Sequence, residues 1–368
     1  MTSDLPALRM VHLSGGLRAF DYGDTPIDVQ AGEELTIASF VRPKYAQLYS
    51  GLSQLGLAPI GVDFFKHDLE ARGLLPPDWR VFNIKEGFSA YEVEHAWGGV
   101  RNVKSQQIDE VIDIAGRFRT YLRLLNLRVR EISEAYHLAL RCKLLMAKEA
   151  GRPVRPGLSA GGYLTYIEAA VHAFLADAAA LRDLIAEATW GLVLKRSDHI
   201  VTSQAGFLKR TKAETHPLAI EIQQAGEQGG WIKNLTDLRN AVIHIAPMAD
   251  AHELHMLDLR VREAAGTQAP YVHFPLTTKQ GGVRERPPRM RGGQEELAAR
   301  LQEYAAFVAE SGDALEYAAA TFRQLAHLSD RVRLAAGLST ETMVFDKSNI
   351  IGPVKITRRV VPHGEQAT

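Results

Sequence analysis

Residues 104–150 read KSQQIDEVIDIAGRFRTYLRLLNLRVREISEAYHLALRCKLLMAKEA, with no proline and one glycine, Gly116. Apolar residues recur in this stretch at alternating steps of three and four. That spacing gives a period of 3.5 residues, which is typical of a long helix packed lengthwise on another helix. We therefore predict one long helix here. Its apolar stripe consists of Ile108, Val111, Ala115, Phe118, Leu122, Leu125, Val129, Ile132, Tyr136 and Ala139.

A second apolar row runs along the same stretch. Because two rows cover more than one face of the helix, the pattern favours a helical bundle over an isolated two-stranded coil. The stripe is also compatible with the seam of a dimer, so intrachain core and dimer seam both stay open. The second row consists of Ile112, Ile114, Leu124, Leu138 and Leu145.

The remaining residues after the long helix predict further helices joined by loops. Glycine and proline mark loops at 151–162 and 278–293. The segment 254–272 has no clear pattern. Helices are expected at 163–190, at 216–228 with Pro217 near the start, at 235–245, and at 294–336 as one helix or a pair.

The first hundred residues mix strand and helix patterns. Runs that favour strands lie at 34–41 and 79–84, and 44–55 is compatible with a helix. The expected fold class is therefore mainly α. It comprises a helical bundle over 104–336, a small α/β or β-rich module over 1–103, and a C-terminal tail over 337–368 with short strands within 342–361.

Composition limits the classes of function. The 368 residues include 43 basic and 43 acidic side chains, so the formal net charge is zero. Proteins that coat nucleic acid or anionic lipid carry a large cationic excess, which excludes that class here. Cys142 is the only cysteine, and neither a signal peptide nor an apolar run near the ~20 residues of a spanning helix is apparent. We expect a cytoplasmic protein that contacts no membrane.

One short motif points to chemistry. Residues 238–244 read LRNAVIH, in which an arginine and an asparagine precede three apolar residues and a histidine at the predicted end of a helix. The motif resembles the signature of the HEPN superfamily, matching it at Arg239, Asn240 and His244. The resemblance implies a helical-bundle core over about 157–260, a dimer, and a metal-independent ribonuclease in a toxin or phage-defence setting.

These residue types suit RNA cleavage on chemical grounds. RNA supplies its own nucleophile, the 2′-OH, so cleavage needs proton transfer and charge stabilisation but neither metal nor cofactor. Histidine titrates near neutrality, and the planar arginine fork binds two phosphate oxygens. Asn240 is expected to orient Arg239 or His244, or to donate to a phosphate. Residues five apart on a helix diverge by roughly 140°, so a groove built from two copies is expected.

Local positive charge supports RNA as a partner. Besides RNA, we expect a second copy of the chain and allow for a regulatory partner protein. Two alternatives stay open: a non-catalytic helical interaction or scaffold protein, and a nucleotide-binding bundle. The candidate substrate-binding residues are Lys195, Arg196, Lys209, Arg210 and Lys212, for which a solvated surface is an equally good interpretation.

Overall fold

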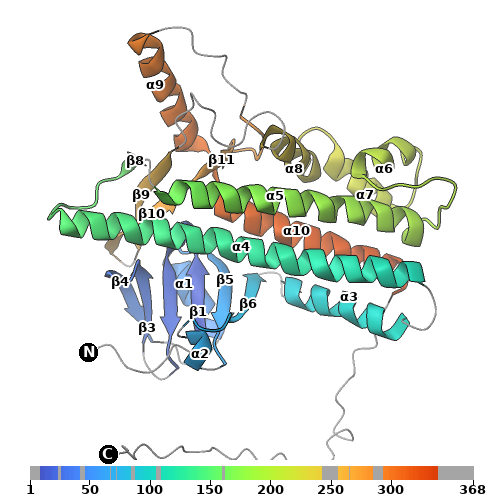
Figure 1. The fold of residues 1–368 in the computed structure, drawn as a ribbon, viewed down its shortest axis with the longest axis horizontal. Coiled ribbons are helices and arrows are strands. Elements are labelled where there is room, and N and C mark those ends of the chain that lie inside the picture. Colours follow the sequence, from blue (N-terminus) through green and yellow to red (C-terminus); the bar gives the residue numbers. More distant parts are fainter. Residues whose placement is uncertain are drawn as a thin grey trace, which may run out of the picture.

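The computed structural model arranges the chain in layers. A strand layer lies beneath one very long helix, and further helices lie on the opposite side of that helix (Figure 1). The termini of the chain are not among the described residues. The structure describes residues 9–23, 26–41, 46–66, 68–71, 73–83, 88–104, 109–159, 162–242, 256–264, 266–284 and 293–338.

The strand layer is a seven-stranded sheet in which every hydrogen-bonded pair is antiparallel. Its order is β4-β3-β2-β1-β5-β6-β7, so the first four strands form a meander and β5 returns to the free edge of β1. The predicted strands at 34–41 and 79–84 and the helix at 44–55 are confirmed as β4, β6 and α1. The bounds are β1 Arg9–Leu13, β2 Arg18–Asp21, β3 Ile27–Ala31, β4 Leu35–Phe40, α1 Ala46–Gln54, β5 Pro59–Phe64, α2 Asp68–Ala71, β6 Asp78–Asn83 and β7 Phe88–Ser89.

The predicted long helix is confirmed as α4, Asp109–Glu149, preceded by α3, Ala90–Lys104. From Val111 to Ala139 every residue of the apolar stripe is buried within a single chain, and Ile108 lies outside the described residues. The stripe joins one apolar core with α5, Gly162–Ala188, and α10, Ala314–Ala335. It is therefore an intrachain core and is not exposed to a second copy.

The mainly α expectation is wrong, because the sheet is not a small appendage. Its strands share the continuous core of α4, α5 and α10. Two further sheets lie within the region expected to be purely helical: β8 Gly157–Ser159 with β9 Leu257–Ala264 and β10 Thr267–His273, and β11 Pro275–Thr277 with β12 Gly312–Asp313. Strands of two to eight residues give too little periodic signal to be recognised beside a helix of 41 residues.

Most helix predictions after α4 are confirmed. Residues 216–228 form α7, Pro217–Gly226, with Pro217 in the first turn, and 294–336 form the pair α9, Gln294–Glu310, and α10. The helix expected at 235–245 begins earlier, as α8, Trp231–Asn240. The loop expected at 151–162 contains β8, and 254–272 contains most of β9 and β10. The strands predicted within 342–361 lie outside the described residues.

One described segment, Gly162–Val193, is long and apolar enough to cross a membrane by length and composition alone. It comprises α5 and the π-helical turn Thr189–Val193. Its Asp177 pairs with Arg128 of α4 at 2.9 Å, and its Glu187 pairs with Arg117 of the same helix. Its buried residues belong to the apolar core, which fits a central helix of a layered fold.

Candidate functional site

The predicted motif lies at the end of α8. Ile232, Leu235 and Leu238 are buried, whereas Arg239 is partly exposed and Asn240 is exposed. Arg239 Nη1 donates to Asn240 Oδ1 at 3.1 Å, so the structure brings these two predicted residues together. His244 lies outside the described residues. The described part of the motif is thus a polar pair on the open side of a helix whose other side is packed in the core.

A polar anchor fixes the middle of α8. Arg182 of α5 donates to Thr236 Oγ1 at 2.8 Å, and Thr236 also contacts Gln204, the first residue of α6, Gln204–Arg210. Because Thr236 lies about one helical turn before Arg239, this anchor restricts how the exposed end of α8 can move.

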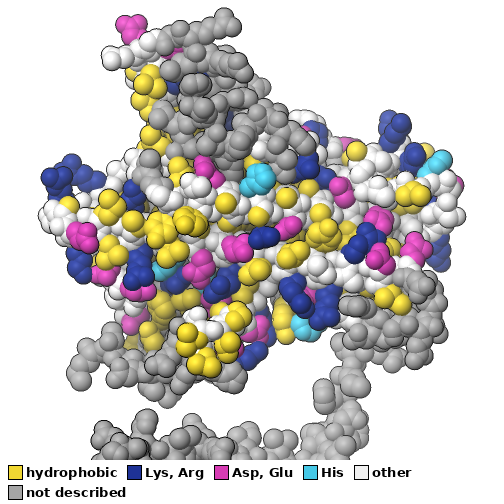
Figure 2. Space-filling view, in the orientation of Figure 1, with side chains coloured by type: hydrophobic (Ala, Val, Ile, Leu, Met, Phe, Trp, Pro, Cys, Tyr) yellow, Lys and Arg dark blue, Asp and Glu magenta, His cyan; other side chains and the backbone are white. Residues whose placement is uncertain are grey.

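The five predicted substrate-binding residues are all exposed. Lys209 and Arg210 lie in the last turn of α6, and Arg196 pairs with Glu214 at 3.2 Å. Figure 2 shows basic and acidic side chains interspersed over one face of the molecule. The other two predicted substrate-binding residues, Lys195 and Lys212, are also exposed.

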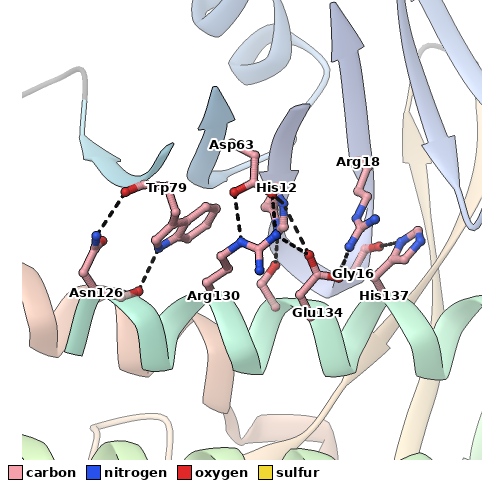
Figure 3. Close-up of polar contacts among 10 residues, drawn as sticks. His12, Gly16, Arg18, Asp63, Trp79, Asn126, Arg130, Glu134 and His137 are labelled. Atoms are coloured by element: carbon pink, nitrogen blue, oxygen red, sulfur yellow. Dashed lines mark hydrogen bonds and ion pairs between the residues drawn. The ribbon is translucent and has the colours of Figure 1, made fainter. Parts of the chain in front are cut away.

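A second polar cluster, which the sequence analysis did not identify, lies between the sheet and α4 (Figure 3). His12 of β1 contacts Asp63 of β5 through Nε2 at 3.1 Å and Ser133 of α4 through Nδ1 at 3.0 Å. Arg130 of α4 donates Nε and Nη2 to the two oxygens of Asp63, both at 2.9 Å. Such a two-pronged contact is the strong geometry for an arginine and a carboxylate.

The same cluster continues along α4. Arg18 of β2 pairs with Glu134, and Arg130 also reaches Glu134 at 3.3 Å. His137 contacts the carbonyl oxygen of Gly16 at 3.1 Å. We call His12, Arg18, Asp63, Arg130, Ser133, Glu134 and His137 the buried network.

The protonation states follow from burial and charge. Burial would raise the pKa of Asp63, but hydrogen bonds from His12 and Arg130 outweigh it and lower that pKa to about 2. Burial lowers the pKa of His12, and burial together with Arg18 lowers the pKa of His137 to about 4. A neutral His12 beside an ionised Asp63 must carry its hydrogen on Nε2, so Ser133 donates to Nδ1.

The buried network has a set of atoms that fits a metal ion only in part. Ligand atoms of His12, Asp63 and Glu134 lie within 4.8 Å of one another. However, Arg130 and Arg18 already neutralise the two carboxylates at hydrogen-bonding range. A cation there would have to displace the partly buried guanidinium groups of Arg18 and Arg130, which is costly. The network therefore acts as a structural connection between sheet and helix.

Sequence reasoning missed this cluster because hydropathy patterns register apolar residues only. A signal was present: Asn126, Arg130, Ser133 and His137 recur at steps of four, three and four, beside the apolar stripe. Asn126 exchanges two hydrogen bonds with Trp79 of β6, at 2.7 and 3.1 Å. This polar row is the face of α4 that contacts the sheet.

Comparisons with known proteins do not assign this chain. A scan against protein-family models found no match, and searches of curated proteins and of solved structures found none either.

Proposed function

We propose that this chain is a metal-independent endoribonuclease of the HEPN type, with Arg239, Asn240 and His244 in its active site. The observation that carries the proposal is the contact between Arg239 and Asn240 on the open side of α8, whose opposite side is buried. A polar pair held at the surface by a fixed helix is accessible to a polymer, unlike the buried network.

Each residue has a separate task in the proposed reaction. Arg239 binds the scissile phosphate, and the contact from Asn240 limits the orientations of its guanidinium group. His244 moves protons to and from the reacting oxygens. The 2′-OH of the substrate attacks the phosphate, the 5′-oxygen leaves with a proton, and a 2′,3′-cyclic phosphate is formed. The exposed lysines and arginines near α6 then bind flanking phosphates.

A composite groove from two copies belongs to the same proposal. The apolar stripe of α4 is buried within one chain, so it cannot form the contact between two copies. The opposite side of α4 carries Leu127, 43% exposed, and Leu138, 37% exposed. These residues are eleven apart, or about three turns, and therefore share a face. We propose this face as the dimer contact, which sedimentation equilibrium at micromolar protein tests: a monomer contradicts it, and Leu127→Glu should dissociate a dimer.

The activity test is cleavage of a structured and an unstructured RNA in the presence of EDTA. We expect products with 2′,3′-cyclic phosphate ends and a loss of about 100-fold or more in Arg239→Ala and in His244→Ala. Matched controls are Arg155→Ala and His199→Ala, which remove an exposed arginine and an exposed histidine elsewhere. Intact RNA with well-folded protein would overturn the ribonuclease and leave the scaffold alternative.

A further inference from the structure

A hollow of about 340 Å³ opens between the turn Ser14–Gly16, the β9–β10 hairpin and the start of α10. Its lining includes Gly15, Arg262, Tyr271, His273, Ser311 and Asp313. Gly15 has a φ of +75°, and a Cβ there would lie 2.6 Å from Cβ of Tyr271. The turn thus packs directly against the hairpin, so segments distant in sequence form the walls together.

Three side chains in this hollow are arranged in a chain of contacts. Ser311 Oγ lies 2.9 Å from His273 Nε2, and His273 Nδ1 lies 3.5 Å from Asp313 Oδ2. The serine is on one ring nitrogen and the carboxylate on the other, which is the order that a serine nucleophile, its base and the orienting acid require. Ser311 is partly exposed, whereas His273 is buried.

The carboxylate and the base are held in place. Asp313 caps α10 by accepting from the backbone N–H groups of Leu315 and Glu316 at 2.9 and 3.1 Å, and Tyr136 donates to its Oδ2 at 2.9 Å. Burial lowers the pKa of His273 to about 4, so the imidazole is neutral at pH 7 and its Nε2 can accept a hydrogen bond from Ser311. A fixed acid and a neutral ring preorganise the contacts.

The serine hydroxyl has two acceptors. Besides His273, it lies 2.9 Å from the carbonyl oxygen of Val308. That carbonyl also accepts from Arg260 Nη2 at 2.5 Å, so it keeps a donor when the hydroxyl hydrogen turns to the histidine. Rotation about one C–O bond therefore switches Ser311 from a capping contact of α9 to an activated nucleophile.

Arg262 supplies charge to the hollow. Its guanidinium lies 3.9 Å from the centre of the Tyr271 ring, and Nη1 contacts Ser14 Oγ at 3.3 Å. Its Nε is buried, and in the part of the chain that the structure describes it has no hydrogen-bond partner. Arg260, by contrast, is paired with Asp258. Arg262 lines the hollow and has no carboxylate partner among the described residues, so its positive charge favours a ligand that carries an acidic group.

We propose that Ser311, His273 and Asp313 form a second catalytic site, which hydrolyses a carboxylic ester carrying a negatively charged group bound by Arg262. Ser311 Oγ attacks the carbonyl carbon and its proton passes to His273 Nε2. The bond to the alcohol oxygen breaks, and the alcohol leaves with that proton. Water then attacks the acyl-serine, again giving its proton to His273, and the acid leaves as Ser311 recovers its hydrogen. Water is the only co-reactant.

A fluorophosphonate–biotin probe tests the nucleophile in the full-length protein. We expect one label, on the tryptic peptide 301–323, in which Ser311 is the only serine. Ser311→Ala should abolish labelling, and His273→Ala should slow it by about 100-fold or more. Ser197→Ala, an exposed serine elsewhere, is the matched control. Absence of label on Ser311 in the wild-type protein overturns the proposal, whatever the folding of the variants.

Paired esters test the substrate class. Hydrolysis of 4-acetoxybenzoate should exceed that of the uncharged 4-acetoxybenzamide by about tenfold or more, and Arg262→Gln should remove this preference while fluorophosphonate labelling persists. Equal rates in the wild-type protein would overturn the role of Arg262. RNA cleavage by Ser311→Ala should be unchanged, so the outcome here is separate from that for Arg239 and His244.

Discussion

A serine, a histidine and an aspartate meet in two regions of the described chain. In the buried network, His12 joins Ser133 and Asp63 at 3.0 and 3.1 Å. At the start of α10, His273 joins Ser311 and Asp313 at 2.9 and 3.5 Å. The residue types are identical and the serine contacts are similar in length, but the contact to the aspartate is longer at α10, and the surroundings differ in exposure and in charge pairing.

The difference separates a structural contact from a reactive one. Asp63 is bound by both prongs of Arg130, and Ser133 is buried against the sheet, so a substrate has no access to it. Ser311 lines a hollow that Arg262 also lines, and the guanidinium group of Arg262 has no carboxylate partner among the described residues. A closed and fully paired group stabilises the fold, whereas an open group with unused hydrogen-bonding capacity is available for chemistry.

The largest expected loss of stability is in the buried network. Asp63→Asn keeps the shape of the side chain but leaves Arg130 and His12 without their ionised partner. Removal of one member of a buried ion pair costs about 3–5 kcal/mol of unfolding free energy. Urea denaturation measures this, and Asp28→Asn, a carboxylate whose hydrogen bond to Ser39 is exposed, should change stability by less than about 0.5 kcal/mol. Similar losses in both variants would show that the network is not a structural connection.

A fall in pH should reduce the contribution of the buried network to stability more than that of the residues around Ser311. The folded pKa of His137 is about 4, below its ordinary value of 6.5, so between these values the unfolded chain binds more protons and stability falls as pH falls. A shift of this size corresponds to on the order of 3 kcal/mol between pH 7 and 4.

Near Ser311 two titrations oppose each other. The pKa of His273 is also lowered to about 4, but burial raises the pKa of Asp313 to about 6, so its contribution increases as pH falls. We would measure the free energy of unfolding by urea denaturation at pH values from 7 to 4. Compared with the wild-type protein, His137→Gln should make this free energy depend less steeply on pH. The double variant His273→Gln, Asp313→Asn should change the pH dependence by a smaller amount. A larger change in the double variant than in His137→Gln would contradict the distinction between the buried network and the site around Ser311.

The contacts of α4 show which parts of the fold can be predicted from the sequence. The apolar stripe of α4 predicts its own burial because a 3.5-residue period repeats over eight turns or so. The sheet was underestimated because part of its contact with α4 is made by Arg130, Ser133 and His137, which a search for apolar periodicity does not detect. Buried polar contacts also depend on a partner strand far away in sequence, such as β5, so the polar row on α4 does not by itself identify what it contacts.

Candidate sites follow the same rule. Arg239 and Asn240 are adjacent in sequence, so their contact on α8 is a local property that a motif can encode. Ser311 and Asp313 are two residues apart, but His273 comes from the end of β10, and only the pairing of β11 with β12 brings them together. A catalytic arrangement assembled by tertiary structure cannot be recognised from spacing in one chain.

A smaller loss of stability is expected when Ser133 of the buried network is replaced. Ser133→Ala leaves Nδ1 of His12 buried without its donor, and such a group costs about 1–3 kcal/mol. Thermal and urea unfolding should both report the loss, and Ser133→Thr should retain part of the stability because it keeps a hydroxyl. The tryptic peptide 131–141, which contains Ser133, should remain unlabelled by the fluorophosphonate in wild-type protein. Label on that peptide would mean that the network is open to solvent.

The smallest effect on stability is expected at Ser311. In Ser311→Ala, water in the hollow can donate to His273 Nε2, and the carbonyl of Val308 keeps its bond from Arg260. The free energy of unfolding should therefore change by less than about 0.5 kcal/mol, measured in the same urea series as Ser133→Ala. Because both serines contact a buried histidine at about 3 Å, the pair isolates the effect of the surroundings. An equal cost at both positions would mean that Ser311 is as closed as Ser133, and that its contact with His273 serves the fold.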